Sequence, residues 1–118
     1  MPNQGDVRKI ALSLPETTED PNVFRFFVEA KQFAWVWLER IDPKKARVPN
    51  PDVIGVRVAD DLDKQVLLAS DREVFFTEPH YDGYPAVLVR LSRIDRARLE
   101  EVLTNAWRCR ASPRLRSR

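Results

Sequence analysis

The sequence predicts an α+β fold, in which N-terminal, middle and C-terminal helices pack mainly on one face of an antiparallel β-sheet. The chain has 118 residues, of which 43% are hydrophobic and 32% charged, enough for one domain with a packed core. Helical periodicity occurs at both ends and in the middle, with strand-like segments between. This order favours an α+β domain. We expect one domain at residues 1–110 and a basic tail at 111–118.

The first helix is expected to begin at Asp6, whose carboxylate can accept hydrogen bonds from the free amides of the first turn. One apolar stripe follows at the spacing of a helix face: Val7, Ile10, Ala11 and Leu14. Pro15 ends the helix, because the residue before a proline disfavours the α region. Residues 16–22 are polar and predict a turn.

Two strands are predicted at 23–28 and 32–38, since both segments are rich in aromatic and β-branched residues. Six of the eleven aromatic residues fall here: Phe24, Phe26, Phe27, Phe33, Trp35 and Trp37. In the first strand, Arg25 and Phe27 point away from the apolar face. The second strand is apolar on both faces, as expected for an interior strand.

Residues 42–52 hold three prolines and three cations and predict a surface loop. A third strand is predicted at 53–58, with Arg57 on its polar face. Asp60 or Asp61 is expected to cap a short helix that ends at Ala69. The buried side of this helix is predicted to carry Leu62, Val66 and Ala69.

The C-terminal third predicts a short apolar segment at 74–76, a tight loop at 79–85 and a strand at 86–91. The last helix has the clearest pattern, with Ser92 or Asp95 as its cap. Its buried stripe is predicted to be Leu99, Val102, Leu103, Ala106 and Trp107. Pro113 prevents the helix from continuing.

The charge is distributed unevenly along the chain. All 18 acidic residues precede position 102, whereas five of the 20 cations lie at 108–118, so residues 1–105 carry a charge of −3. The sequence pI of about 8.9 therefore reflects the end of the chain. A solubilising tail or a frayed helix end is favoured over a nucleic-acid-binding arm, which stays open.

Several classes of function find no support in the sequence. No apolar stretch is long enough to span a membrane, and residues 1–6 do not resemble a secretory signal. One cysteine and one histidine exclude a Cys/His zinc site, and no phosphate-binding glycine loop occurs. His80, Cys109 and the acidic group at 60–63 have simpler roles as a loop residue, a spectator thiol and helix caps. We therefore expect no enzymatic activity and no cofactor.

Cationic side chains offer a weak indication of nucleic-acid binding. Strand alternation places Arg25, Arg57 and Arg90 on the face away from the helices, beside Phe27, where cations and an aromatic ring can contact phosphates and stack a base. The favoured alternative pairs these arginines with Glu29. A second basic site, on the loop at 42–52, consists of Lys44, Lys45 and Arg47, although a solvated loop is the simpler interpretation.

The segment 78–85 is the most distinctive in the chain. His80, Tyr81 and Tyr84 lie between prolines and form either a rigid recognition surface or a closure over one end of the sheet. The sequence does not decide between the two.

Taken together, these segments resemble the MmcQ/YjbR family. The matching segments are 10–16 (IALSLPE), 26–28 (FFV), 31–34 (KQFA), 75–85 (FFTEPHYDGYP), 87–91 (VLVRL) and 106–108 (AWR). The resemblance implies a CyaY-like (frataxin-like) fold and DNA binding of a double-wing type, without cofactor or catalytic residues. The chain departs from the family pattern at 22–24 and in its longer loop at 43–51, where added cations compensate for an altered wing.

We therefore expect a small, non-enzymatic, cytoplasmic bacterial protein that binds DNA as a monomer. Phosphate contacts are assigned to Arg25, Arg57, Arg90, Lys44, Lys45, Arg47, Arg114 and Arg116. The alternative is an adaptor that binds a protein or small ligand through the exposed sheet or the His80–Tyr84 loop. The negative charge of residues 1–105, which repels a polyanion, supports this alternative.

Overall fold

The computed structural model describes residues 1–117 and confirms the α+β fold class. Six strands form one antiparallel sheet in the order β1-β2-β3-β4-β6-β5. The elements in chain order are α1 (Gln4–Ser13), β1 (Thr17–Glu19), β2 (Arg25–Val28), β3 (Lys31–Glu39), β4 (Val48–Arg57), α2 (Asp61–Ser70), β5 (Phe75–Phe76), the 3₁₀ turn η1 (Pro79–Tyr81), β6 (Ala86–Arg90), α3 (Arg96–Arg110) and α4 (Pro113–Arg116).

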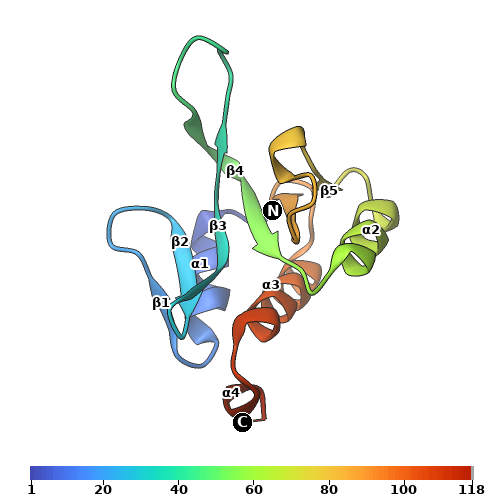
Figure 1. The fold of residues 1–118 in the computed structure, drawn as a ribbon. Coiled ribbons are helices and arrows are strands. Elements are labelled where there is room, and N and C mark those ends of the chain that lie inside the picture. Colours follow the sequence, from blue (N-terminus) through green and yellow to red (C-terminus); the bar gives the residue numbers. More distant parts are fainter. Residues whose placement is uncertain (118) are drawn as a thin grey trace.

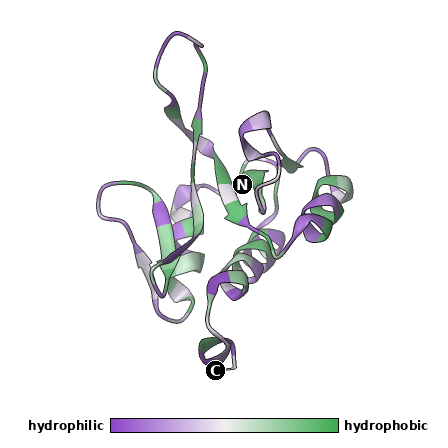
Figure 2. Cartoon of the chain, in the orientation of Figure 1, coloured by the Kyte–Doolittle hydropathy of each residue, from purple (hydrophilic) through white to green (hydrophobic). Residues whose placement is uncertain are grey.

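The sheet separates two apolar clusters. The larger cluster joins α1, α3 and α4 to one face of the sheet, and α1 and α3 also pack against each other. The smaller cluster lies on the other face, where Tyr81 of η1 covers Trp35, Val53 and Leu88. Figure 1 shows the hairpin of β3 and β4 projecting far beyond this body, and Figure 2 shows that its end is mostly hydrophilic.

The last helix agrees with the sequence pattern. All five residues of the predicted stripe are buried, and the Asp95 side chain accepts a hydrogen bond from the backbone N–H of Arg98. Because a cap and a full apolar stripe agree here, local and tertiary preferences select the same helix.

The first helix begins earlier than Asp6. The Asn3 side chain caps it by accepting from the Asp6 N–H, while the Asp6 carboxylate accepts from the Asn3 N–H. This capping box places Asp6 at the third helical position rather than at the cap. The predicted stripe is otherwise correct, since Val7, Ile10 and Ala11 are buried.

The polar stretch after Pro15 is not only a turn. Residues Thr17–Glu19 form β1, which pairs with Phe26–Val28 of β2. β1 is an edge strand and is held by backbone hydrogen bonds to β2 alone. Its three residues are polar, so the alternating apolar pattern that identifies a strand in a sequence is missing here.

β4, which was predicted as the third strand at 53–58, begins earlier, within the predicted loop at 42–52. Its first residues, Val48–Asn50, pair with Trp37–Glu39 of β3, whereas the pairing of β4 with β6 starts only at Val53. Residues 48–50 therefore have a strand on one side only, which tolerates Pro49, and Pro51 lies in the irregularity between Asn50 and Ile54, where a proline is also tolerated.

The predicted buried face of the middle helix is wrong. Leu62 and Val66 of α2 are 71% and 58% exposed, while Leu67 and Leu68 pack on the core and Lys64 is buried. The Lys64 Nζ donates to the carbonyl oxygens of Tyr81 at 2.7 Å and Tyr84 at 2.9 Å. These two hydrogen bonds compensate the cost of removing the ammonium group from water. The helix therefore packs through a face that includes Lys64, which a hydrophobic pattern does not predict.

Candidate nucleic-acid interface

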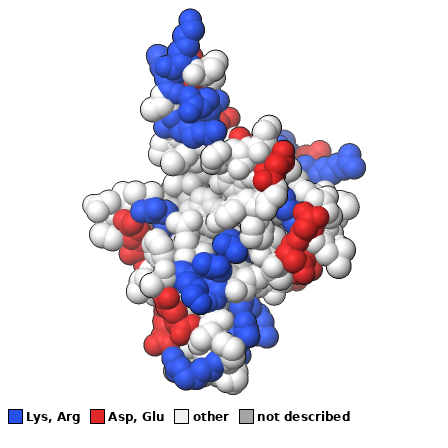
Figure 3. All heavy atoms as spheres, in the orientation of Figure 1, with Lys and Arg blue, Asp and Glu red and all other residues white. Residues whose placement is uncertain are grey.

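The projecting β3–β4 hairpin, residues 38–49, carries exposed cations and is called the arm here. Its turn is braced internally, because Arg40 Nη1 donates to the carbonyl oxygens of Pro43 and Lys45, and the Asp42 carboxylate accepts from the Lys44 N–H. The side chains of Lys44 and Lys45 are exposed and make no ion pair with any residue of the described chain. Figure 3 shows the arm as a predominantly blue projection.

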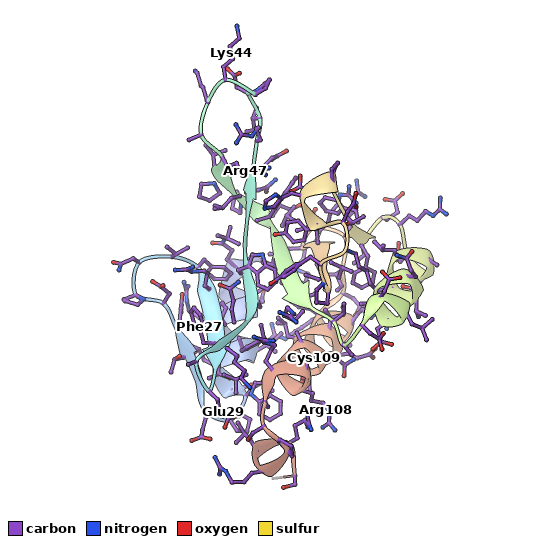
Figure 4. All side chains as sticks on the ribbon, in the orientation of Figure 1. Phe27, Glu29, Lys44, Arg47, Arg108 and Cys109 are labelled. Carbon is purple, nitrogen blue, oxygen red and sulfur yellow. The ribbon has the colours of Figure 1, made fainter. Side chains whose placement is uncertain are left out.

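Arg47 lies at the root of the arm and differs from the two lysines. Its Nη1 donates to the Leu38 carbonyl oxygen at 3.1 Å and lies 3.5 Å from the Glu78 carboxylate. Its charge is therefore partly compensated, and the uncompensated cations of the arm concentrate toward its tip (Figure 4).

The three sheet arginines each lie over an aromatic ring. The guanidinium carbon is 5.8 Å from the Phe27 centroid for Arg25, 5.3 Å from Tyr84 for Arg57 and 4.0 Å from Phe76 for Arg90. These contacts bury the stems of the arginines on apolar surface and are favourable in themselves.

The same three arginines do not converge on one platform. Arg25 forms an ion pair with Asp20 at 2.7 Å, and Arg90 donates to the backbone carbonyl oxygens of Arg72 and Glu73. In the β4–β6 ladder, Arg57 pairs with Ala86 and Arg90 pairs with Val53, at opposite ends of the ladder.

The expected partner of these arginines binds elsewhere. The Glu29 carboxylate accepts from the Ser112 N–H at 2.6 Å and lies 3.9 Å from Arg114. The hydrogen bond from Ser112 lowers the pKa of Glu29. Glu29 therefore fastens the C-terminal segment to the β2–β3 turn instead of shielding the sheet arginines.

The loop at 78–85 closes over the sheet face that the sequence left uncovered. Tyr81 is 8% exposed, and its hydroxyl oxygen accepts from Trp35 Nε1 at 2.9 Å. Burial raises the pKa of Tyr81. His80 and Tyr84 stay exposed, so the loop combines both interpretations: Tyr81 closes the sheet, and its neighbours remain available on the surface.

A cavity of about 370 Å³ opens beside this loop, at the root of the arm. Four aromatic rings line it, namely Trp35, Trp37, His80 and Tyr81, and Arg25 and Arg47 are among the other lining residues. Both arginines already have carboxylate partners. The cavity is therefore an apolar pocket with little uncompensated charge.

The C-terminal segment folds onto the body rather than extending as a free tail. Leu115 of α4 is fully buried, and the Ser112 side chain caps the helix. Arg114 approaches Glu16 and Glu29, whereas Arg116 donates to the carbonyl oxygens of Arg108 and Ala111. Arg118 lies outside the described residues.

Two groups of cations were not assigned to a site from the sequence. Arg40 holds the turn of the arm through its hydrogen bond to the Lys45 carbonyl oxygen. Its position between a predicted strand and a proline-rich loop could have indicated this role. Arg108 lines one cleft with Arg57 and Arg116, and Arg110 acts on the same thiol, Cys109, as Arg57 and Arg116 do. Residue spacing does not reveal this proximity of distant segments. Within residues 1–117 no cluster of potential metal ligands occurs, and none of the described helices could span a membrane.

The fold and this surface define a small α+β domain with a cationic arm and a loop-covered sheet. The family description YjbR matches residues 12–109, so the chain belongs to the YjbR family. It is similar to the uncharacterized proteins Mb2600 of Mycobacterium bovis and Rv2570 of Mycobacterium tuberculosis. Each is 42% identical over 117 residues, covering 93% of this chain and 89% of the relative. No solved structure matches the chain.

Proposed function

We propose that this protein binds double-stranded DNA without catalysis, through phosphate contacts made by the arm. The observation that carries the proposal is the pair Lys44 and Lys45, exposed on a projecting hairpin without acidic partners. Phosphate neutralisation by such cations supplies most of the sequence-independent affinity for DNA.

The shape of the arm supports this role. A two-stranded ribbon fits the major groove of B-DNA, which is about 12 Å wide. The internal hydrogen bonds of Arg40 and Asp42 hold the turn in one conformation, which lowers the entropy lost on binding. A non-catalytic role accords with His80, which makes no hydrogen bond with another residue of the described chain.

Fluorescence anisotropy of a labelled duplex at several salt concentrations tests the proposal. Counterion release gives a slope of log K against log salt of about −0.9 per phosphate contact. The double variant Lys44→Gln/Lys45→Gln should therefore flatten the slope by about 1.8 and weaken binding across unrelated sequences.

The matched control is Lys9→Gln/Lys31→Gln, which removes the same charge from exposed positions on the body. This control should leave the slope nearly unchanged. Equal slopes for the two double variants, or no submicromolar binding by the wild type at low salt, would contradict the proposal. Deleting residues 111–118 is a poor test, because it removes the buried Leu115 as well as charge.

The aromatic cavity favours a second candidate, a ligand-binding adaptor. A volume of about 370 Å³ lies within the range of small-molecule pockets. Quenching of tryptophan fluorescence by a planar ligand, lost in His80→Ala but retained in the arm variant, would support the adaptor over DNA binding.

A further inference from the structure

Four arginines gather at the C-terminal end of α3 without acidic partners. Arg57 is the last residue of β4, Arg108 and Arg110 belong to α3, and Arg116 belongs to α4. Within residues 1–117, none of the four forms an ion pair, whereas six other arginines do: Arg8, Arg25, Arg47, Arg96, Arg98 and Arg114. Figure 4 shows Arg108 and Cys109 close to α4, at the end of the molecule away from the arm.

Two of these guanidinium groups hold N–H donors that lack an acceptor. The Nε atoms of Arg57 and Arg110 are buried and have no hydrogen-bond partner among the described residues. A buried donor without an acceptor is unfavourable, and more so when it is charged. Both groups therefore favour an anion that supplies oxygen acceptors.

Three of the four arginines line a cleft, whereas Arg110 is not among its lining residues. The cleft has a volume of about 540 Å³, and its walls include Arg57, Arg108 and Arg116. Asn105 adds a side-chain amide, and Asp63 is the one acidic residue of the lining. The hydrogen bonds from Arg116 to two carbonyl oxygens, with the buried Leu115 beside it, fix this guanidinium at the rim.

Three of the four arginines act electrostatically on the thiol of Cys109. Burial raises the pKa of its thiol, and so does the Asp63 carboxylate, while Arg57, Arg110 and Arg116 each oppose this effect. Since all three arginines influence one sulfur atom that also lines the cleft, their fields overlap there.

We propose that this cleft binds a phosphate group, as the free ion, a diphosphate or the phosphate end of a small ligand. Guanidinium groups present planar, paired N–H donors that match phosphate oxygens, and unlike lysines they stay charged when partly buried. The volume admits a phosphate with an attached group. The site is separate from the arm and does not rest on the DNA-binding proposal.

Cys109 provides the assay, because it is the only cysteine in the chain. The rate of its alkylation by uncharged iodoacetamide is measured by mass spectrometry at constant ionic strength, with inorganic phosphate or pyrophosphate added. Saturable protection is expected, because an occupied cleft covers the sulfur. Duplex DNA is tested as a third ligand in the same assay. Protection by phosphate or pyrophosphate supports a free phosphorylated ligand, and protection by DNA alone supports a phosphate site occupied by a phosphodiester backbone.

The matched pair Arg116→Gln and Arg114→Gln tests the residues. Both positions lie on α4 and lose the same charge, yet Arg114 faces Glu16 and Glu29 while Arg116 lines the cleft. Arg116→Gln should weaken the protecting affinity about tenfold, the loss expected for one charged hydrogen-bonded contact, and Arg114→Gln should leave it unchanged.

Thermal unfolding establishes that each variant is folded. If Arg116→Gln unfolds, the exposed Arg108→Gln takes its place with the same expected result. No saturable protection by phosphate, pyrophosphate or DNA overturns the proposal, and so does equal weakening by the two α4 variants. The arm variant Lys44→Gln/Lys45→Gln should keep full protection by pyrophosphate, so failure of this site and failure of DNA binding are distinguishable.

Discussion

Gly55 is the residue on which the covered sheet face depends most directly. A Cβ atom at position 55 would clash with Nε1 and lie 2.5 Å from Cε2 of Trp35, because the indole lies against the glycine backbone. The same Nε1 donates to Tyr81, which anchors the loop. The substitution Gly55→Ala must therefore displace the indole ring and weaken the closure of the loop.

The expected cost combines two effects. Overpacking of a core contact costs about 1–3 kcal/mol. Loss of the Trp35–Tyr81 hydrogen bond adds about 1 kcal/mol, so the free energy of unfolding should fall by about 2–4 kcal/mol. This is a large part of the about 5–15 kcal/mol that stabilises a typical domain.

Urea unfolding followed by tryptophan fluorescence measures this change. Tyr81→Phe is the companion variant, because it removes the hydroxyl acceptor without crowding the indole, and it should cost about 1–3 kcal/mol. In the double variant the two effects should be less than additive, since both disturb one hydrogen bond. A loss below about 0.5 kcal/mol in Gly55→Ala, the range of ordinary surface substitutions, would refute the reasoning.

Three further predictions concern the segments that hold the surface in place. Lys64→Met should lower the free energy of unfolding by about 2–3 kcal/mol in urea titrations, because two loop carbonyl oxygens lose a charged donor. Leu115→Ala should cost about 2–3 kcal/mol or release α4, which amide hydrogen exchange detects as lost protection after position 110. The pKa of Glu29 is lowered by its hydrogen bond from Ser112, so its contribution is present above the ordinary value of 4.5 and is lost as pH falls through the lowered pKa. The protection factor of the Ser112 amide, which corrects for the intrinsic pH dependence of exchange, should therefore fall in acid, and Glu29→Gln should remove that fall.

The sequence predicted the elements whose local and tertiary preferences agree. The cap and stripe of α3 and the apolar pattern of β3 and β6 are examples. It failed for α2, where burial of Lys64 is favourable only because two carbonyl oxygens from a distant loop accept its hydrogen bonds. Such partners lie 17 and 20 residues away and leave no periodic signal.

The site was predictable to a smaller extent. The cations at 44, 45 and 47 were correctly placed at the surface between two strands, but pairing of Val48–Asn50 with β3, which lengthens the arm, was not foreseen. The loop at 78–85 was recognised as distinctive, yet its burial of Tyr81 depends on Trp35, 46 residues earlier. Strand alternation gives the face of a side chain and not its ionic partner.

Local pairing, more than the charge of a segment, decides which cations can meet a polyanion. The negative charge of residues 1–105 argued for an adaptor, but Asp20 forms an ion pair with Arg25 and Glu78 forms one with Arg47 at the root of the arm. Lys44 and Lys45 keep their charge exposed on the arm, and Figure 3 shows the arm as a mostly blue projection. At the other end of the chain the arginines divide, since Arg114 is neutralised and Arg116 is not. Because screening confines such interactions to about 10 Å at 0.1 M salt, two separate basic surfaces can act independently on a chain whose net charge is only +2.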